Sequence, residues 1–137
     1  MLYLAADHRE FELKEAIKKF LSEQGITTED CGAFSYNQED DYPDFAAAAS
    51  AKILKNPSKN KGIFICGSGV GMSIAANRVK GIRAAIVWNT KQARLARQDD
   101  DANVLALGAD EMVEHIALEV VTTWLNTPFS KEKRHIR

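Results

Sequence analysis

The sequence of 137 residues contains no long hydrophobic run and few cysteines, and it has almost no net charge. Two cysteines are too few for a disulfide framework. The longest stretch without a charged residue, 62–77, is interrupted by glycine, serine and asparagine, so it does not resemble a membrane span. Charged residues from position 7 onward end the N-terminal apolar stretch too early for a signal peptide. We therefore expect a cytoplasmic protein with free thiols and no membrane partner.

The charges nearly cancel, since 18 basic and 19 acidic side chains give a formal net charge of −1. This balance argues against a dedicated nucleic-acid partner. A composition of 45% hydrophobic and 27% charged residues argues against disorder. A chain of this length is too short for a (β/α)8 barrel, which needs about 250 residues. We therefore expect a single domain over residues 1–137.

Short apolar runs alternate along the chain with segments of helical period. The runs predict strands at 1–6, 26–31, 62–66, 82–88 and 103–107. The periodic segments predict helices at 10–24, 45–54, 72–79, 90–98 and 111–125, with Thr90 as an N-cap. An acidic loop at 35–44 and a polar tail at 126–137 remain. This alternation predicts an α/β fold with a five-stranded parallel sheet and helices on both faces.

Ligands of such sheets bind outside the carboxyl ends of the strands, which directs attention to the glycine-rich loop at 66–71. Alternate glycines after a buried strand expose backbone N–H groups, and these can stabilise an anion or the thiolate of Cys66. A tight turn with a buried structural cysteine is the alternative interpretation. The loop lacks the Gly-Lys-Ser/Thr of a P-loop and the GxGxxG of a dinucleotide site, and Met72 stands where a cysteine phosphatase needs arginine.

Three other polar segments are candidates for function. Asp7 and His8 follow the first strand, where a carboxylate and an imidazole can bind sugar hydroxyls or a phosphate. The aspartates at 99–101 are either a solvated helix end or, because a helix C-terminus disfavours acids, a functional group. The basic tail at 131–137 is either a frayed terminus or a phosphate clamp.

Taken together, these residues resemble the ribose-5-phosphate isomerase B and galactose-6-phosphate isomerase family. The matching stretches are residues 6–8, 41–43, 62–63, 65–71, 73–77, 81–84, 102–104, 107–108 and 134–135. They occur in the same order over nearly the whole chain, and the block ICGSGVG-x-SIAAN at 65–77 is highly specific.

The resemblance implies a Rossmann-like three-layer α/β/α sandwich that forms a homodimer or a dimer of dimers. It also implies active sites at the subunit interface, with the tail at 126–137 contacting a partner subunit. The implied reaction is aldose–ketose isomerisation of a sugar phosphate without a metal or another cofactor, with ribose 5-phosphate as the leading substrate. A six-carbon sugar phosphate, a non-catalytic sugar-phosphate binder and a nucleotide-binding module are the alternatives.

The resemblance also assigns roles to individual residues. Cys66 is similar to the base that moves a proton between C1 and C2 of the open-chain sugar. Ser68 and the loop amides correspond to the cradle for the enediolate oxygens. The expected substrate contacts are Asp7, His8, Tyr42, Gly67, Gly69, Val70, Gly71, Asp100, Arg134 and Arg137.

The chain departs from the family pattern at three places. Family members commonly have His-Asn where this chain has Asp99-Asp100, and that histidine is the proton donor in ring opening. Asp99 therefore occupies a catalytic position, and whether it replaces the histidine is an open question. Asp110 stands where a basic residue is common, and the tail motif is one residue shorter, ending at Arg137.

Overall fold

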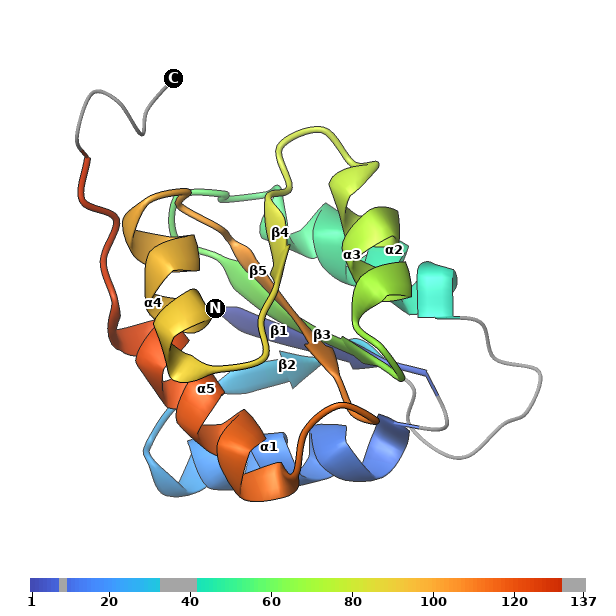
Figure 1. Cartoon of the computed structure of the whole chain (residues 1–137). Helices are drawn as coiled ribbons and strands as arrows, with labels where there is room; N and C mark the ends of the chain where they lie inside the picture. The colour runs from blue at the N-terminus through green and yellow to red at the C-terminus, as the bar shows by residue number, and fades with distance from the viewer. Residues whose placement is uncertain (8–9, 33–41, 132–137) are drawn as a thin grey trace.

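The computed structural model describes residues 1–7, 10–32 and 42–131, and in them five strands alternate with five helices (Figure 1). The strands are β1 (Leu2–Ala6), β2 (Thr28–Asp30), β3 (Lys61–Cys66), β4 (Ala84–Ile86) and β5 (Val104–Gly108). The helices are α1 (Phe11–Glu23), α2 (Tyr42–Ile53), α3 (Val70–Asn77), α4 (Thr90–Gln98) and α5 (Glu114–Asn126).

The strands form one parallel sheet in the order β2-β1-β3-β5-β4, with a helical layer on each face (Figure 1). Helices α1, α4 and α5 cover one face, and their core residues include Ile17, Ala93 and Trp124. Helices α2 and α3 cover the other face through residues such as Ala49 and Met72. The predicted three-layer α/β/α sandwich with a five-stranded parallel sheet is therefore confirmed.

The central strand β3 is buried on both faces, as its unbroken apolar sequence predicts. Successive side chains of a strand point to opposite faces, so Ile63 and Ile65 join the core under α1, α4 and α5. Phe64 and Cys66 join the core under α2 and α3. The sequence of β3 thereby fixes Cys66 at the carboxyl edge of the sheet, on the face where α3 begins.

Several predicted boundaries were wrong. Thr90 is the first residue of α4 and not its cap, because the side chain of Asn89 accepts a hydrogen bond from the Gln92 N–H at 2.8 Å. Helix α3 begins at Val70, two residues before the predicted start, and the Ser73 N–H already donates to the Gly69 carbonyl. The predicted loop at 35–44 ends earlier, since α2 begins at Tyr42.

The chain after α5 packs more closely on the body than its polar sequence predicts. Asn126 is the last residue of α5. Beyond it, the Thr127 carbonyl accepts a hydrogen bond from Arg97 Nε at 3.2 Å, and the Ser130 N–H donates to the Gln98 carbonyl. Residues 127–130 therefore lie against the end of α4. Among the described residues, none of the helices is long and apolar enough to cross a membrane.

Candidate active site

The register of the sheet places three predicted site segments side by side. Ala6 pairs with Ile65 in the parallel ladder, so Asp7 leaves the sheet beside Cys66. Cys66 itself pairs with Gly108 at the end of β5. Neighbouring strands lie about 4.8 Å apart, so Asp7, Cys66 and Gly108 share one edge of the sheet. This is the carboxyl edge, where the topology predicts a ligand.

The sulfur of Cys66 lies against the glycine-rich loop. Its side chain is buried, and Sγ accepts a hydrogen bond from the Gly69 N–H at 3.2 Å. Gly69 has φ +85, in the left-handed region, and this backbone conformation turns its N–H back toward the sulfur. The sulfur therefore lies at an N–H donor beside the N-terminus of α3, where the helix dipole presents positive potential.

Ser68 is exposed in the loop. Its Oγ accepts a hydrogen bond from the Val70 N–H at 3.1 Å, which leaves the hydroxyl proton to be donated to a ligand. The amides of Gly69 and Val70, expected to hold the substrate, are thus engaged inside the loop. The first N–H groups of a helix have no partner within the helix, so the Gly71 N–H near the start of α3 can donate to a ligand.

The chain after β5 holds this loop in place. The N–H groups of Ala109 and Asp110 donate to the carbonyls of Cys66 and Gly67, both at 2.9 Å. A Cβ added to Gly108 would lie 2.4 Å from the Ser68 carbonyl oxygen. The loop can approach this closely only because residue 108 has no side chain. The sequence patterns assign Gly108 no role in the site.

Asp7 is also buried at the carboxyl edge. Its Oδ1 accepts a hydrogen bond from the Glu10 N–H at 3.3 Å, which orients the carboxylate ahead of α1. His8, Arg134 and Arg137, together with the side chain of Tyr42, lie outside the described residues. The structure therefore brings together Asp7, Cys66 and the loop at 67–71 from the predicted set.

Asp99 and Asp100 lie at the opposite edge of the sheet from Cys66 of the same chain. Helix α4 runs back from the carboxyl edge, and Asp99 is its C-cap, shortly before β5 begins at the amino edge. The five residues of β5 span roughly 13 Å, which is far beyond hydrogen-bond reach. One chain alone therefore does not place these aspartates at the Cys66 loop.

The third aspartate of this run, Asp101, has a structural role. It has φ +49, and its carboxylate binds Arg97 Nη1 at 2.9 Å and Arg83 Nη2 at 3.2 Å. Asn103 adds two further hydrogen bonds: its side chain accepts one from the Arg83 N–H and donates one to the Gly81 carbonyl. These contacts fix the turn that carries Asp99 and Asp100. Within the described residues, no group of three or more His, Cys, Asp and Glu could hold a metal ion.

The chain is similar to known proteins over nearly its whole length. The ribose/galactose isomerase family model matches residues 2–137. Ribose-5-phosphate isomerase B of Mycolicibacterium paratuberculosis is 42% identical over 136 residues, which are 99% of this chain and 85% of that protein. The crystal structure of a ribose 5-phosphate isomerase from Thermotoga maritima is 43% identical, with a TM-score of 0.93 over 99% of this chain and 92% of that one.

A second solved structure carries a ligand. Ribose-5-phosphate isomerase B from Mycoplasma genitalium, with bound ribulose-5-phosphate, is 39% identical, with a TM-score of 0.95 over 99% of this chain and 90% of that one. The aligned region extends over nearly the full length of this chain in each comparison. The chain therefore belongs to the ribose/galactose isomerase family, as its sequence predicts.

Proposed function

We propose that this chain, a sugar-phosphate aldose–ketose isomerase by its family, interconverts ribose 5-phosphate and ribulose 5-phosphate with Cys66 as the base. The observation that carries the proposal is the 3.2 Å hydrogen bond from the Gly69 N–H to Cys66 Sγ, at the edge of the sheet that also holds Asp7. A thiolate held by a backbone donor is a base, and the helix N-terminus beside it stabilises an oxyanion.

The proposed reaction moves protons and leaves the atoms of the sugar otherwise unchanged. Cys66 removes the proton from C2 of the open-chain aldose, and the electrons of that bond form a C1–C2 double bond while O1 becomes negative. Ser68 and the amides at the start of α3 stabilise this enediolate. Cys66 then returns the proton to C1, and the hydroxyl proton of O2 passes to O1 as the C2 carbonyl forms. Apart from these proton transfers, no carbon–carbon bond and no carbon–oxygen single bond of the open-chain sugar breaks.

A panel of substrates tests the activity. We expect the purified chain to convert ribose 5-phosphate faster, by kcat/KM, than allose 6-phosphate or galactose 6-phosphate, measured by the ultraviolet absorbance of the ketose. A higher kcat/KM on a six-carbon sugar phosphate would identify that compound, and not ribose 5-phosphate, as the preferred substrate. A non-catalytic sugar-phosphate binder is the second candidate, because Asp99, Asp100 and Asp110 depart from the family pattern. Binding of these phosphates in calorimetry, without turnover of any of them, would support that candidate.

We further propose that the site is shared between two copies of the chain. Asp99 and Asp100 lie at the opposite edge of the sheet from Cys66, so a second copy is needed to present them to the Cys66 loop. Apolar side chains near that loop support such a partner: Val70, Ile74 and Trp88 are 43%, 53% and 44% exposed. In this arrangement Asp99 of one copy faces Cys66 of the other and opens the sugar ring.

Mixing two inactive variants tests the shared site. We expect Cys66→Ala and Asp99→Ala each to be inactive alone, and their mixture, after unfolding and refolding together, to recover roughly a quarter of the wild-type rate. The recovery comes from mixed dimers in which one site keeps both residues. Cys66→Ala mixed with the double variant is the control and should recover nothing.

Two results would contradict the shared site. If Asp99→Ala is fully active alone, Asp99 takes no part in ring opening and the solvent or another group opens the ring. If both single variants are inactive and the mixture recovers no more than its control, each chain carries a complete site.

A further inference from the structure

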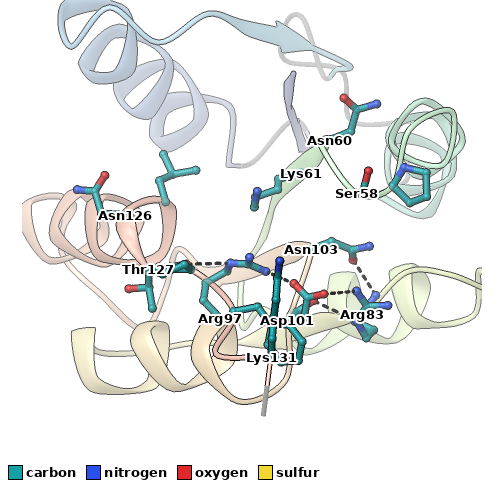
Figure 2. A pocket seen from close by; sticks show the side chains of 14 residues that line it. Ser58, Asn60, Lys61, Arg83, Arg97, Asp101, Asn103, Asn126, Thr127 and Lys131 are labelled. Atoms are coloured by element: carbon teal, nitrogen blue, oxygen red, sulfur yellow. Dashed lines mark hydrogen bonds and ion pairs between the residues drawn. The ribbon is translucent and has the colours of Figure 1, made fainter. Parts of the chain in front are cut away.

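A second cavity lies at the amino edge of the sheet, away from the Cys66 loop (Figure 2). It has a volume of about 860 Å³ and lies between the start of β3, the residue before β4, the end of α4 and the segment after α5. Its polar lining includes Lys61, Arg83, Arg97, Asp101 and Lys131. The parallel strands of β3 and β5 separate it from the carboxyl edge, so it is distinct from the Cys66 loop of the same chain.

The lining of this cavity, called the amino-edge pocket below, is strongly positive. It contains four cations, Lys61, Arg83, Arg97 and Lys131, and one carboxylate, Asp101. That excess stands out in a chain whose formal net charge is −1. In Figure 2 the nitrogen ends of Lys61, Arg97 and Lys131 point toward the same space. Clustered positive charge in a concave surface attracts anions.

Arg97 is held rigidly in the wall of the pocket. The residue is buried, and Nη1 donates to the Ala102 carbonyl at 2.7 Å and to Asp101 Oδ1 at 2.9 Å. Its Nε donates to the Thr127 carbonyl at 3.2 Å. None of these three hydrogen bonds uses Nη2, so the preorganised guanidinium keeps donor capacity for an oxyanion.

Lys61 is the second fixed cation of the pocket. It begins β3 and is half-buried, and no described residue forms a hydrogen bond or an ion pair with its ammonium group. Burial and the nearby Arg97 charge lower the pKa of Lys61. The folded chain therefore keeps a partly desolvated cation beside another cation. An arrangement that is unfavourable without a ligand becomes favourable when an anion binds between the two charges.

We propose that the amino-edge pocket binds a phosphate ester of nucleotide size, with the phosphate between Lys61 and Arg97. A free phosphate would occupy little of the volume, and the pocket also has an apolar wall that includes Pro128 and Phe129. A compact cavity suits a small molecule better than an extended nucleic acid. The proposal rests on contacts within one chain and does not require the isomerase activity, although the pocket adjoins the Asp99–Asp100 turn of the proposed shared site, since Arg97 and Asp101 line it.

Titration with adenosine 5′-monophosphate, followed by amide NMR, tests the pocket. We expect the amide chemical shifts of Lys61, Asn103 and Lys131 to change together and to reach a plateau as the nucleotide concentration rises. The amides of Gly67–Gly71 report binding at the Cys66 loop in the same spectra, so the two sites are read separately. Inorganic phosphate and adenosine are the companion probes, and both should bind the pocket more weakly than the nucleotide.

Two lysine variants make the test specific. We expect Lys61→Met to weaken nucleotide binding at the pocket by about tenfold or more, because it removes one charged hydrogen-bond donor. The matched control is Lys19→Met, an exposed lysine of α1 that does not line the pocket, and it should leave this affinity unchanged. Lys131→Met should weaken binding as well.

Three results would overturn the proposal. One is the absence of shifts at Lys61, Asn103 and Lys131 when the nucleotide is added. Another is an equal loss of affinity in Lys61→Met and Lys19→Met, which would indicate general charge attraction. The third is binding of inorganic phosphate as tight as that of the nucleotide, which would exclude an ester as the ligand.

Discussion

Replacing Cys66 with alanine should lower kcat for ribose 5-phosphate by on the order of 1,000-fold while leaving the fold intact. The expected loss follows from the geometry, because Sγ lies at the carboxyl edge of the sheet, where the Gly69 N–H donates a hydrogen bond to it. Alanine cannot take a proton from C2, and no other described side chain replaces the sulfur at that position. Steady-state kinetics, with circular dichroism to monitor folding, measure both effects.

Cys31→Ala is the matched control for this variant. Cys31 is the second free cysteine, at the end of β2, and it is only partly buried. Burial raises the pKa of the Cys31 thiol, so this cysteine remains protonated at neutral pH. We expect the Cys31 variant to keep the wild-type kcat. A Cys66 variant with activity near that of Cys31→Ala would show that the sulfur is not the base.

Gly108→Ala should reduce kcat by on the order of 100-fold although residue 108 has no functional group. The new Cβ would lie 2.4 Å from the Ser68 carbonyl oxygen, so the loop that carries Ser68 and Gly69 must move. That movement separates the Gly69 N–H from Cys66 Sγ. Overpacking of this kind costs about 1–3 kcal/mol, so the free energy of unfolding should fall as well.

Gly25→Ala separates the two consequences of the Gly108 change. Gly25 has φ +79 at the end of α1, and a Cβ there would meet nothing within 4 Å. Alanine in this conformation costs about 1–2 kcal/mol of stability but cannot displace the Cys66 loop. We expect reduced stability with a wild-type kcat. Equal kcat in Gly108→Ala and Gly25→Ala would show that the packing of β5 against the loop does not position the site.

Local sequence patterns predicted the parts of the site that lie on one strand and the turn after it. The apolar run ending in Cys66 predicts a buried central strand, and the glycines that follow predict a turn before the next helix. The parallel topology then predicts that Asp7 and Cys66 share an edge. These inferences succeed because strand period, turn chemistry and topology depend on neighbouring residues and a few general rules.

Features that depend on tertiary contacts could not be predicted in this way. Lys14 carries a charge in α1, yet it is fully buried against Asp30, with Nζ 2.7 Å from Oδ1. Asp101 belongs to a run of three like charges, but two arginines from different segments bind it. The distance of Asp99 from Cys66 likewise follows only from the course of α4 across the sheet.

Proton NMR of ribose 5-phosphate incubated with the protein in deuterium oxide tests whether Cys66 is the base. We expect ribulose 5-phosphate that carries solvent deuterium at C1 with the wild-type chain and with Cys31→Ala, because a base exchanges its proton with the solvent between the two transfers. With Cys66→Ala we expect neither product nor exchange at C2. Deuterium incorporation by Cys66→Ala at the wild-type rate would contradict the role of Cys66, and a wild-type chain that leaves ribose 5-phosphate unchanged would contradict the proposed activity.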